Sequence, residues 1–180
     1  TLGVKAIGID ILFDQPQDED QELIETLRNM QTPVSVAYVL EEANQGDIEY
    51  DQQIYLEEFL AQLEGSNAHP ASIQLSDNFG VTRLWPQFDE RLPDTLTRAM
   101  LNGAGEGDLT LPEYDGAIRY RLSARDGQND MIEGGQEAVS ESLFPKIPIE
   151  TIANEELFAI PEIAEEYRPL FEGKYVLIGG

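Results

Sequence analysis

The feature that most constrains the fold is an apolar run near the start of the chain, Val4–Phe13. Its even-numbered positions Ala6, Gly8 and Leu12 are as apolar as most of its odd-numbered ones. A strand covered on one face alternates apolar and polar residues, whereas a strand covered on both faces reads as a continuous apolar run. The run therefore predicts a central strand of a sheet that has helices on both sides.

A second run near the end of the chain, Gly173–Gly179, has the same character. Between the two runs, apolar residues recur at helical spacing over 23–30 and 55–63, and a short apolar segment at 34–40 separates these two patterns. Such an order is typical of parallel strands joined by crossover helices. We therefore predict an α/β fold with a mainly parallel central sheet and helices on both faces.

The predicted sheet has three mutually parallel strands near its middle: Lys5–Phe13, Pro33–Leu40 and Lys174–Gly179. A five-residue connection with Asp, Asn and Gly between residues 71–75 and 81–85 predicts a β-hairpin. Residues 102–115 and 126–142 are polar and rich in glycine, which predicts long loops. Other predicted elements are a helix that begins at Pro93, a strand over Gly116–Leu122, a helix over Pro148–Leu157 and a short helix around Pro161–Tyr167.

The 180 residues include 41% hydrophobic ones, enough for a packed core, and we treat residues 1–180 as a single domain. The 35 Asp and Glu outnumber the 11 Lys and Arg, which gives a formal charge of −24. Such a surface repels phosphate, so nucleic acid and anionic lipids are poor partners. Because the same charge opposes close approach of two copies, we expect weak self-association of the isolated domain, which sedimentation at moderate salt tests.

The chain has no cysteine, which excludes disulfides, thiolate metal sites and cysteine nucleophiles. His69 is the single histidine, which argues against a transition-metal site or Ser-His catalysis. We expect neither a metal nor another cofactor. No apolar run reaches the roughly 18 residues of a membrane-spanning helix.

Asp10 lies in the middle of the first apolar run, where an unpaired carboxylate is costly to bury. One interpretation is a structural residue bonded to backbone amides or paired with an arginine such as Arg83 or Arg119. The other is a functional residue. Asp14 follows at the carboxyl end of the same predicted strand, where open α/β sheets hold ligands. The ligand-binding candidates are Asp10, Asp14, Gln15 and Gly179.

A hydrolytic enzyme that uses Asp10 is the alternative from another class. Asp10 and Asp14 are about 13 Å apart along an extended strand, too far to share one metal ion. The acidic residues that follow, Asp18, Asp20 and Glu22, fit the positive end of a helix dipole better than a calcium loop. We therefore predict no catalytic residues.

Three motifs carry a family resemblance: Gly3-x-Lys5-Ala6-Ile7-Gly8-Ile9-Asp10-Ile11-Leu12-Phe13-Asp14-x-Pro16, Leu75–Arg83 and Gly173–Gly179. Together they resemble the CHASE2 domain, an extracytoplasmic sensory module of bacterial membrane receptors. The resemblance implies a domain that binds an unknown small-molecule or environmental ligand. It also implies flanking transmembrane helices of the same receptor that relay the signal to a cytoplasmic cyclase or kinase.

In that family the domain usually continues past the last of these motifs. The resemblance therefore implies a sequence excised from a longer receptor, without the C-terminal end of the family domain. A protein-interaction domain of the cell envelope is the remaining alternative.

Overall fold

The computed structural model describes residues 2–41, 48–75, 89–109, 147–153 and 155–179. The chain divides into two compact units, residues 1–118 with 171–180, and residues 119–170. The first unit contains a parallel sheet with its covering helices, and the second contains short helices.

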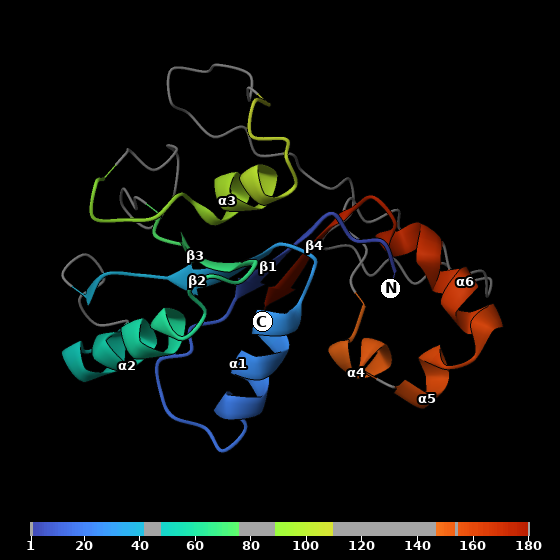
Figure 1. Ribbon diagram of the computed structural model, residues 1–180, viewed down its shortest axis with the longest axis horizontal. Coiled ribbons are helices and arrows are strands. Elements are labelled where there is room, and N and C mark those ends of the chain that lie inside the picture. The colour runs from blue at the N-terminus through green and yellow to red at the C-terminus, as the bar shows by residue number, and fades with distance from the viewer. Residues whose placement is uncertain (1, 42–47, 76–88, 110–146, 154, 180) are drawn as a thin grey trace, which may run out of the picture. The chain divides into compact units, whose positions relative to one another are not determined.

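Four parallel strands form the sheet of the first unit (Figure 1): β1 (Ala6–Asp10), β2 (Val34–Tyr38), β3 (Ala68–Ser72) and β4 (Tyr175–Gly179). Their order is β3-β2-β1-β4, and every neighbouring pair is parallel. The chain therefore adds β2 and β3 on one side of β1 and returns to place β4 on the other side. This arrangement confirms the predicted parallel sheet, although β4 comes last in the order of the described strands, outside the predicted middle.

Helices cover both faces of this sheet, as predicted (Figure 1). Helices α1 (Asp20–Asn29) and α2 (Tyr50–Ala61) lie on one face, and α3 (Leu96–Gly103) lies on the other, against β1, β2 and β3. The apolar periodicity over 23–30 and 55–63 correctly placed α1 and α2.

The main core lies between the sheet and the helices α1 and α2. Its buried members are Ile9, Ile24, Leu27, Val34, Val36, Val39, Ile48, Leu56, Phe59, Leu60, Leu63 and Ala68. Phe13, just after β1, stacks on Phe59 of α2 with ring centroids 4.7 Å apart. Complete burial of each large apolar side chain contributes about 1.5–3 kcal/mol, so this cluster is the largest source of stability in the sheet unit.

The opposite face of the sheet is shaped for the close approach of α3. A Cβ atom at Gly8 would lie 2.6 Å from Met100 Sδ and 3.0 Å from Leu177 Cδ1. At the end of α3, a Cβ atom at Gly103 would lie 2.8 Å from Pro33 Cβ. The two glycines therefore leave the space in which α3 rests on the sheet.

Helix α3 begins later than the sequence predicted. The hydroxyl of Thr95 accepts a hydrogen bond from the Arg98 amide at 3.4 Å, so Thr95 is the N-cap and Pro93 lies before the helix. The backbone of the preceding Asp94 accepts from the Ser72 amide at 2.8 Å, which ties this helix start to the end of β3.

Two strand boundaries also differ from the prediction. Strand β1 ends at Asp10 and not at Phe13, because β4 ends beside Asp10 and no described strand continues along residues 11–13. Strand β3 lies three residues earlier than expected and pairs with β2 in parallel. The second half of the predicted hairpin (81–85) and the predicted strand at 116–122 lie outside the described residues, so both stay predictions.

The second unit contains α4 (Ile149–Ile152), α5 (Glu155–Phe158) and α6 (Pro161–Phe171), whose last residue belongs to the first unit. The single helix predicted over Pro148–Leu157 is therefore two short helices, and the one predicted from Pro161 is longer than expected. The rings of Phe158 and Tyr167 meet edge to face with centroids 5.3 Å apart. Among the described residues, no helix combines the length and the apolar character needed to cross a membrane.

Leu56→Ala should lower the free energy of unfolding by about 2–5 kcal/mol, because it leaves a cavity in the core. The matched control is Ile54→Ala on the same helix, since Ile54 is 38% exposed and Leu56 is 0% exposed. Ile54→Ala should lower the free energy of unfolding by less than about 1 kcal/mol. Urea unfolding followed by circular dichroism measures both, and equal losses would contradict the assignment of the core face of α2.

Candidate functional site

The topology of the sheet singles out one edge as the candidate ligand site. Open α/β sheets bind ligands beyond the carboxyl ends of their strands, at the point where the strand order reverses. Here the reversal lies between β1, which leads to β2 and β3, and β4 on its other side. The last residues of these strands, Asp10 and Gly179, are in register. We call the carboxyl ends of β1 and β4, with residues 11–19 that follow β1, the switch-point edge.

Asp10 is exposed, so the prediction that it is buried is wrong. The reason is the early end of β1, which puts Asp10 at the rim of the sheet and not in the middle of a covered strand. Burial therefore gives no ground for a structural role. The suggested partners Arg83 and Arg119 lie outside the described residues, and their pairing with Asp10 stays a prediction.

The four candidate residues fall into two groups. A Cβ atom at Gly179 would lie 3.3 Å from Asp10 Cβ, so these two residues are direct neighbours. Side chains alternate along a strand, which places Asp10 on the same sheet face as Gly8 and α3. Asp14 instead contacts α2, which covers the opposite face. Gln15 is exposed beside Asp14.

Asp14 is held by a residue that the sequence did not suggest. The side-chain amide of Gln52, in the first turn of α2, donates from Nε2 to Asp14 Oδ2 at 2.6 Å. The other end of the same amide, Oε1, accepts from the Glu49 backbone amide at 2.8 Å. Gln52 thus links the loop after β1 to the N-terminal end of α2.

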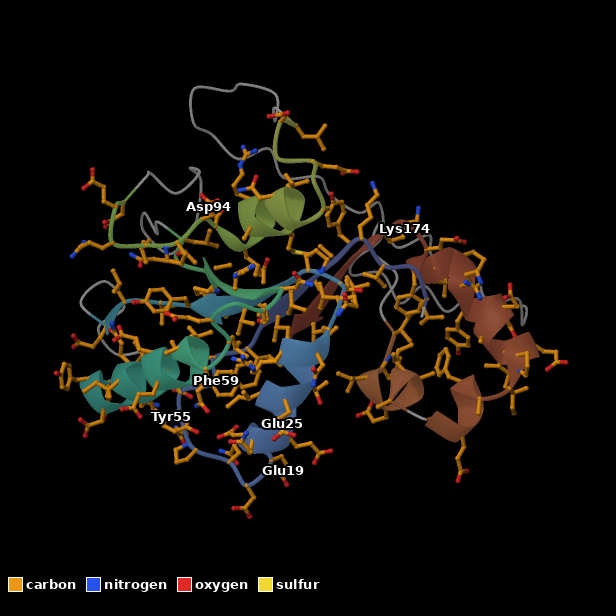
Figure 2. The ribbon with its side chains drawn as sticks, viewed as in Figure 1. Glu19, Glu25, Tyr55, Phe59, Asp94 and Lys174 are labelled. Carbon is orange, nitrogen blue, oxygen red and sulfur yellow. The ribbon has the colours of Figure 1, made fainter. Side chains whose placement is uncertain are left out.

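A second contact ties the same loop to α2 further along. The Tyr55 hydroxyl donates to Asp20 Oδ2 at 2.5 Å, and the Gln17 backbone amide donates to the same oxygen at 2.7 Å. Tyr55 lies next to Phe59 on the side of α2 that faces this loop (Figure 2). The Tyr55 hydrogen bond, and after it the Gln17 amide, hold the pKa of Asp20 below its ordinary value. The same carboxylate raises the pKa of Tyr55.

The residue next to Gln52 makes the matching link to β2. Gln53 accepts from the Glu41 backbone amide at 2.6 Å and donates to Glu57 Oε1 at 2.7 Å. The Tyr38 hydroxyl, at the end of β2, donates to the same Glu57 oxygen at 3.2 Å. Burial and the Glu57 carboxylate raise the pKa of Tyr38. Two consecutive glutamines therefore connect the first turn of α2 to the exits of β1 and β2.

The opposite, amino-terminal edge of the sheet has its own polar cluster. Glu106, in the turn after α3, accepts from Lys5 Nζ and from the Tyr175 hydroxyl at 2.5 Å. These donors lower the pKa of Glu106, with Lys5 the larger cause. The same carboxylate raises the pKa of Tyr175 to about 12. The cluster fastens α3 to the starts of β1 and β4, far along the strands from the candidate residues.

Within the described parts of the chain, no three His, Asp or Glu side chains converge on a point that could hold a metal ion. The switch-point edge instead offers single carboxylates, one exposed at Asp10 and one half-buried at Asp14. Carboxylates accept hydrogen bonds and attract cations, so this edge is suited to a ligand that carries donors or positive charge.

Comparisons of this chain with protein-family models, with curated proteins and with solved structures find no match. Its function is therefore inferred from the residues and the geometry above.

Tyr55→Phe should raise the pKa of Asp20 toward its ordinary value, because the phenylalanine ring cannot donate a hydrogen bond. A carboxyl group with a lowered folded-state pKa stabilises the fold above its unfolded pKa, and this contribution is lost as the pH falls through the folded value. The difference in unfolding free energy between parent and variant should therefore shrink as the pH falls below about 4.

Carboxyl-carbon NMR titration of Asp20 and urea unfolding at several pH values measure these two effects. Tyr50→Phe is the control, since Tyr50 lies on the same helix and is 69% exposed. A titration of Asp20 that is the same in parent and Tyr55→Phe would show that the hydroxyl does not set this pKa.

Proposed function

We propose that this chain is the extracytoplasmic sensory domain of a membrane-bound receptor and binds its ligand at the switch-point edge. The observation that carries the proposal is the parallel pairing of β1 with β4, which ends with the exposed Asp10 beside Gly179. Two of the three motifs that resemble the CHASE2 domain fall on these strands. Most of the third, residues 75–83, lies outside the described residues.

The proposed mechanism is a shift between two conformations of the domain. A ligand that binds one conformation more tightly increases the population of that conformation. The difference between its affinities for the two conformations limits the size of the shift. Transmembrane helices of the same receptor relay the change to a cytoplasmic cyclase or kinase. The ligand is a small molecule or another environmental signal, and the formal charge of −24 disfavours an anionic one.

The location is tested by thiol labelling, because these 180 residues contain no cysteine and any labelling above that of the unsubstituted receptor reports the introduced thiol. Glu64→Cys introduces one thiol at an exposed position, and Val36→Cys introduces one that is 0% exposed. In intact cells that express the gene, a membrane-impermeant maleimide should label Glu64→Cys. The Val36→Cys protein should react only after denaturation. Labelling of Glu64→Cys only after the cells are lysed would place the domain in the cytoplasm and refute the proposal.

A hydrolytic enzyme is the second candidate, and the exposed carboxylate of Asp10 at the switch point is the observation in its favour. We propose that the domain is not catalytic, since the described residues at this edge provide no nucleophile with an adjacent base. A screen of the purified domain with phosphatase, esterase and nuclease substrates should give no turnover above the blank. Turnover that Asp10→Asn abolishes would establish the enzyme instead.

A further inference from the structure

Both the nitrogen and the oxygen of the Gln52 side-chain amide form hydrogen bonds. Its nitrogen donates to the Asp14 carboxylate at 2.6 Å, and its oxygen accepts from the Glu49 amide at 2.8 Å. The orientation of the amide is fixed by chemistry, because a carboxylate only accepts and a backbone amide only donates. Asp14 and the N-terminal end of α2 are therefore joined through one planar group.

This link makes the two contacts depend on each other. Glu49 is the N-cap residue of α2, and its backbone amide is one of the groups at a helix start that need a partner from outside the helix ladder. If Asp14 no longer accepts from Gln52 Nε2, the amide loses one of the two bonds that hold its rotamer. The bond from Glu49 to Gln52 Oε1 then opens more often.

The rest of the loop is anchored separately, so a change at Asp14 stays local. Phe13 stacks on Phe59 before Asp14, and Asp20 accepts from Tyr55 after it. These contacts hold both ends of the loop on α2 whether or not the Asp14 carboxylate is engaged.

We propose that Gln52 is a positioning residue for Asp14 and couples the switch-point edge to the first turn of α2. A ligand donor that competes for the Asp14 carboxylate loosens this helix end, and a ligand that leaves the Gln52 bond in place does not. The role of a ligand in this inference rests on the proposed function, whereas the coupling between Asp14 and Glu49 does not.

Glutamine is the side chain that this role requires. Glutamate at position 52 keeps an acceptor for the Glu49 amide but has no donor for Asp14 and repels its carboxylate. Gln52→Glu should therefore release Asp14 while it leaves the Glu49 bond available, so it separates the two halves of the link.

The test is the solvent exchange of the Glu49 backbone amide in the full chain, measured by NMR. Asp14→Ala should accelerate it by about 3- to 10-fold, the factor that corresponds to the loss of one ordinary hydrogen bond. Asp14→Asn retains an acceptor oxygen, so the Glu49 amide in this variant should exchange within about 2-fold of the parent rate. Gln15→Ala alters the exposed neighbour of Asp14 and should have no effect.

The amide of Val36 in the core of the sheet reports on global opening. Unchanged exchange at Glu49 in Asp14→Ala overturns the coupling, and so does an equal acceleration at Glu49 and Val36, which would show general destabilisation. Failure of Asp14→Asn to restore the parent rate also contradicts it. So does an Asp14→Ala effect of full size in the Gln52→Glu background, where Asp14 has no Gln52 donor to lose. None of these measurements needs a ligand, so they succeed or fail independently of the thiol-labelling test of the proposed function.

Discussion

The pairing of β1 with β4 is the constraint on which the rest of the structure depends. It joins residues 6–10 to residues 175–179 over five residue pairs, and it creates the reversal of strand order. Without β4, each later strand of the described sheet is added on the same side, from β1 to β2 to β3. The strand order then does not reverse, and the sheet has no switch point. The pair also determines which residues form the carboxyl-terminal edge, because both strands end at the same level with Asp10 beside Gly179.

The two faces of this pair are stabilised in different ways. On one face, apolar side chains of β1 and β2 enter the core that α1 and α2 complete. On the other face, the absence of a side chain at Gly8 lets Met100 of α3 pack directly against β1. Directional hydrogen bonds at the two edges of the sheet add specific contacts between the helices and the strands. Glu106 does this at the amino-terminal edge, and Gln52 and Gln53 do it at the carboxyl-terminal edge.

The sequence was sufficient for the architecture because apolar patterns distinguish strands from helices, although β4, whose residues are half-buried or exposed, is not covered as its continuous apolar run predicted. Continuous apolar runs predicted β1, β2 and β4, and helical spacing predicted α1 and α2. Strand β3 was misplaced because its sequence, Ala-His-Pro-Ala-Ser, lacks the usual strand residues. Proline at position 70 is tolerated there since β3 is an end strand among those described.

The site was less predictable, because its geometry depends on tertiary placement. Whether Asp10 is buried depends on where β4 stops, which no local pattern near Asp10 reports. Gln52 and Tyr55 read in the sequence as ordinary polar positions of a helix. Their partners, Asp14 after β1 and Asp20 at the start of α1, are at least 35 residues away. Asp14 and Gly179 were chosen as candidates because the carboxyl ends of parallel strands are a general location for ligands, and their ligand-binding role stays a prediction.

The long separation between β1 and β4 has a consequence for how the protein acquires its site during synthesis. Strands β1, β2 and β3 and helices α1 and α2 all lie within residues 6–72, so the buried residues of the main core are made before β4. One side of β1 then stays unpaired until more than 100 further residues have been made. Over that interval it presents free backbone groups, which makes it a target for mispairing and for chaperones. Closure of so distant a contact is also expected to be slow. The edge assigned here to ligand recognition is therefore the last part of the sheet to form.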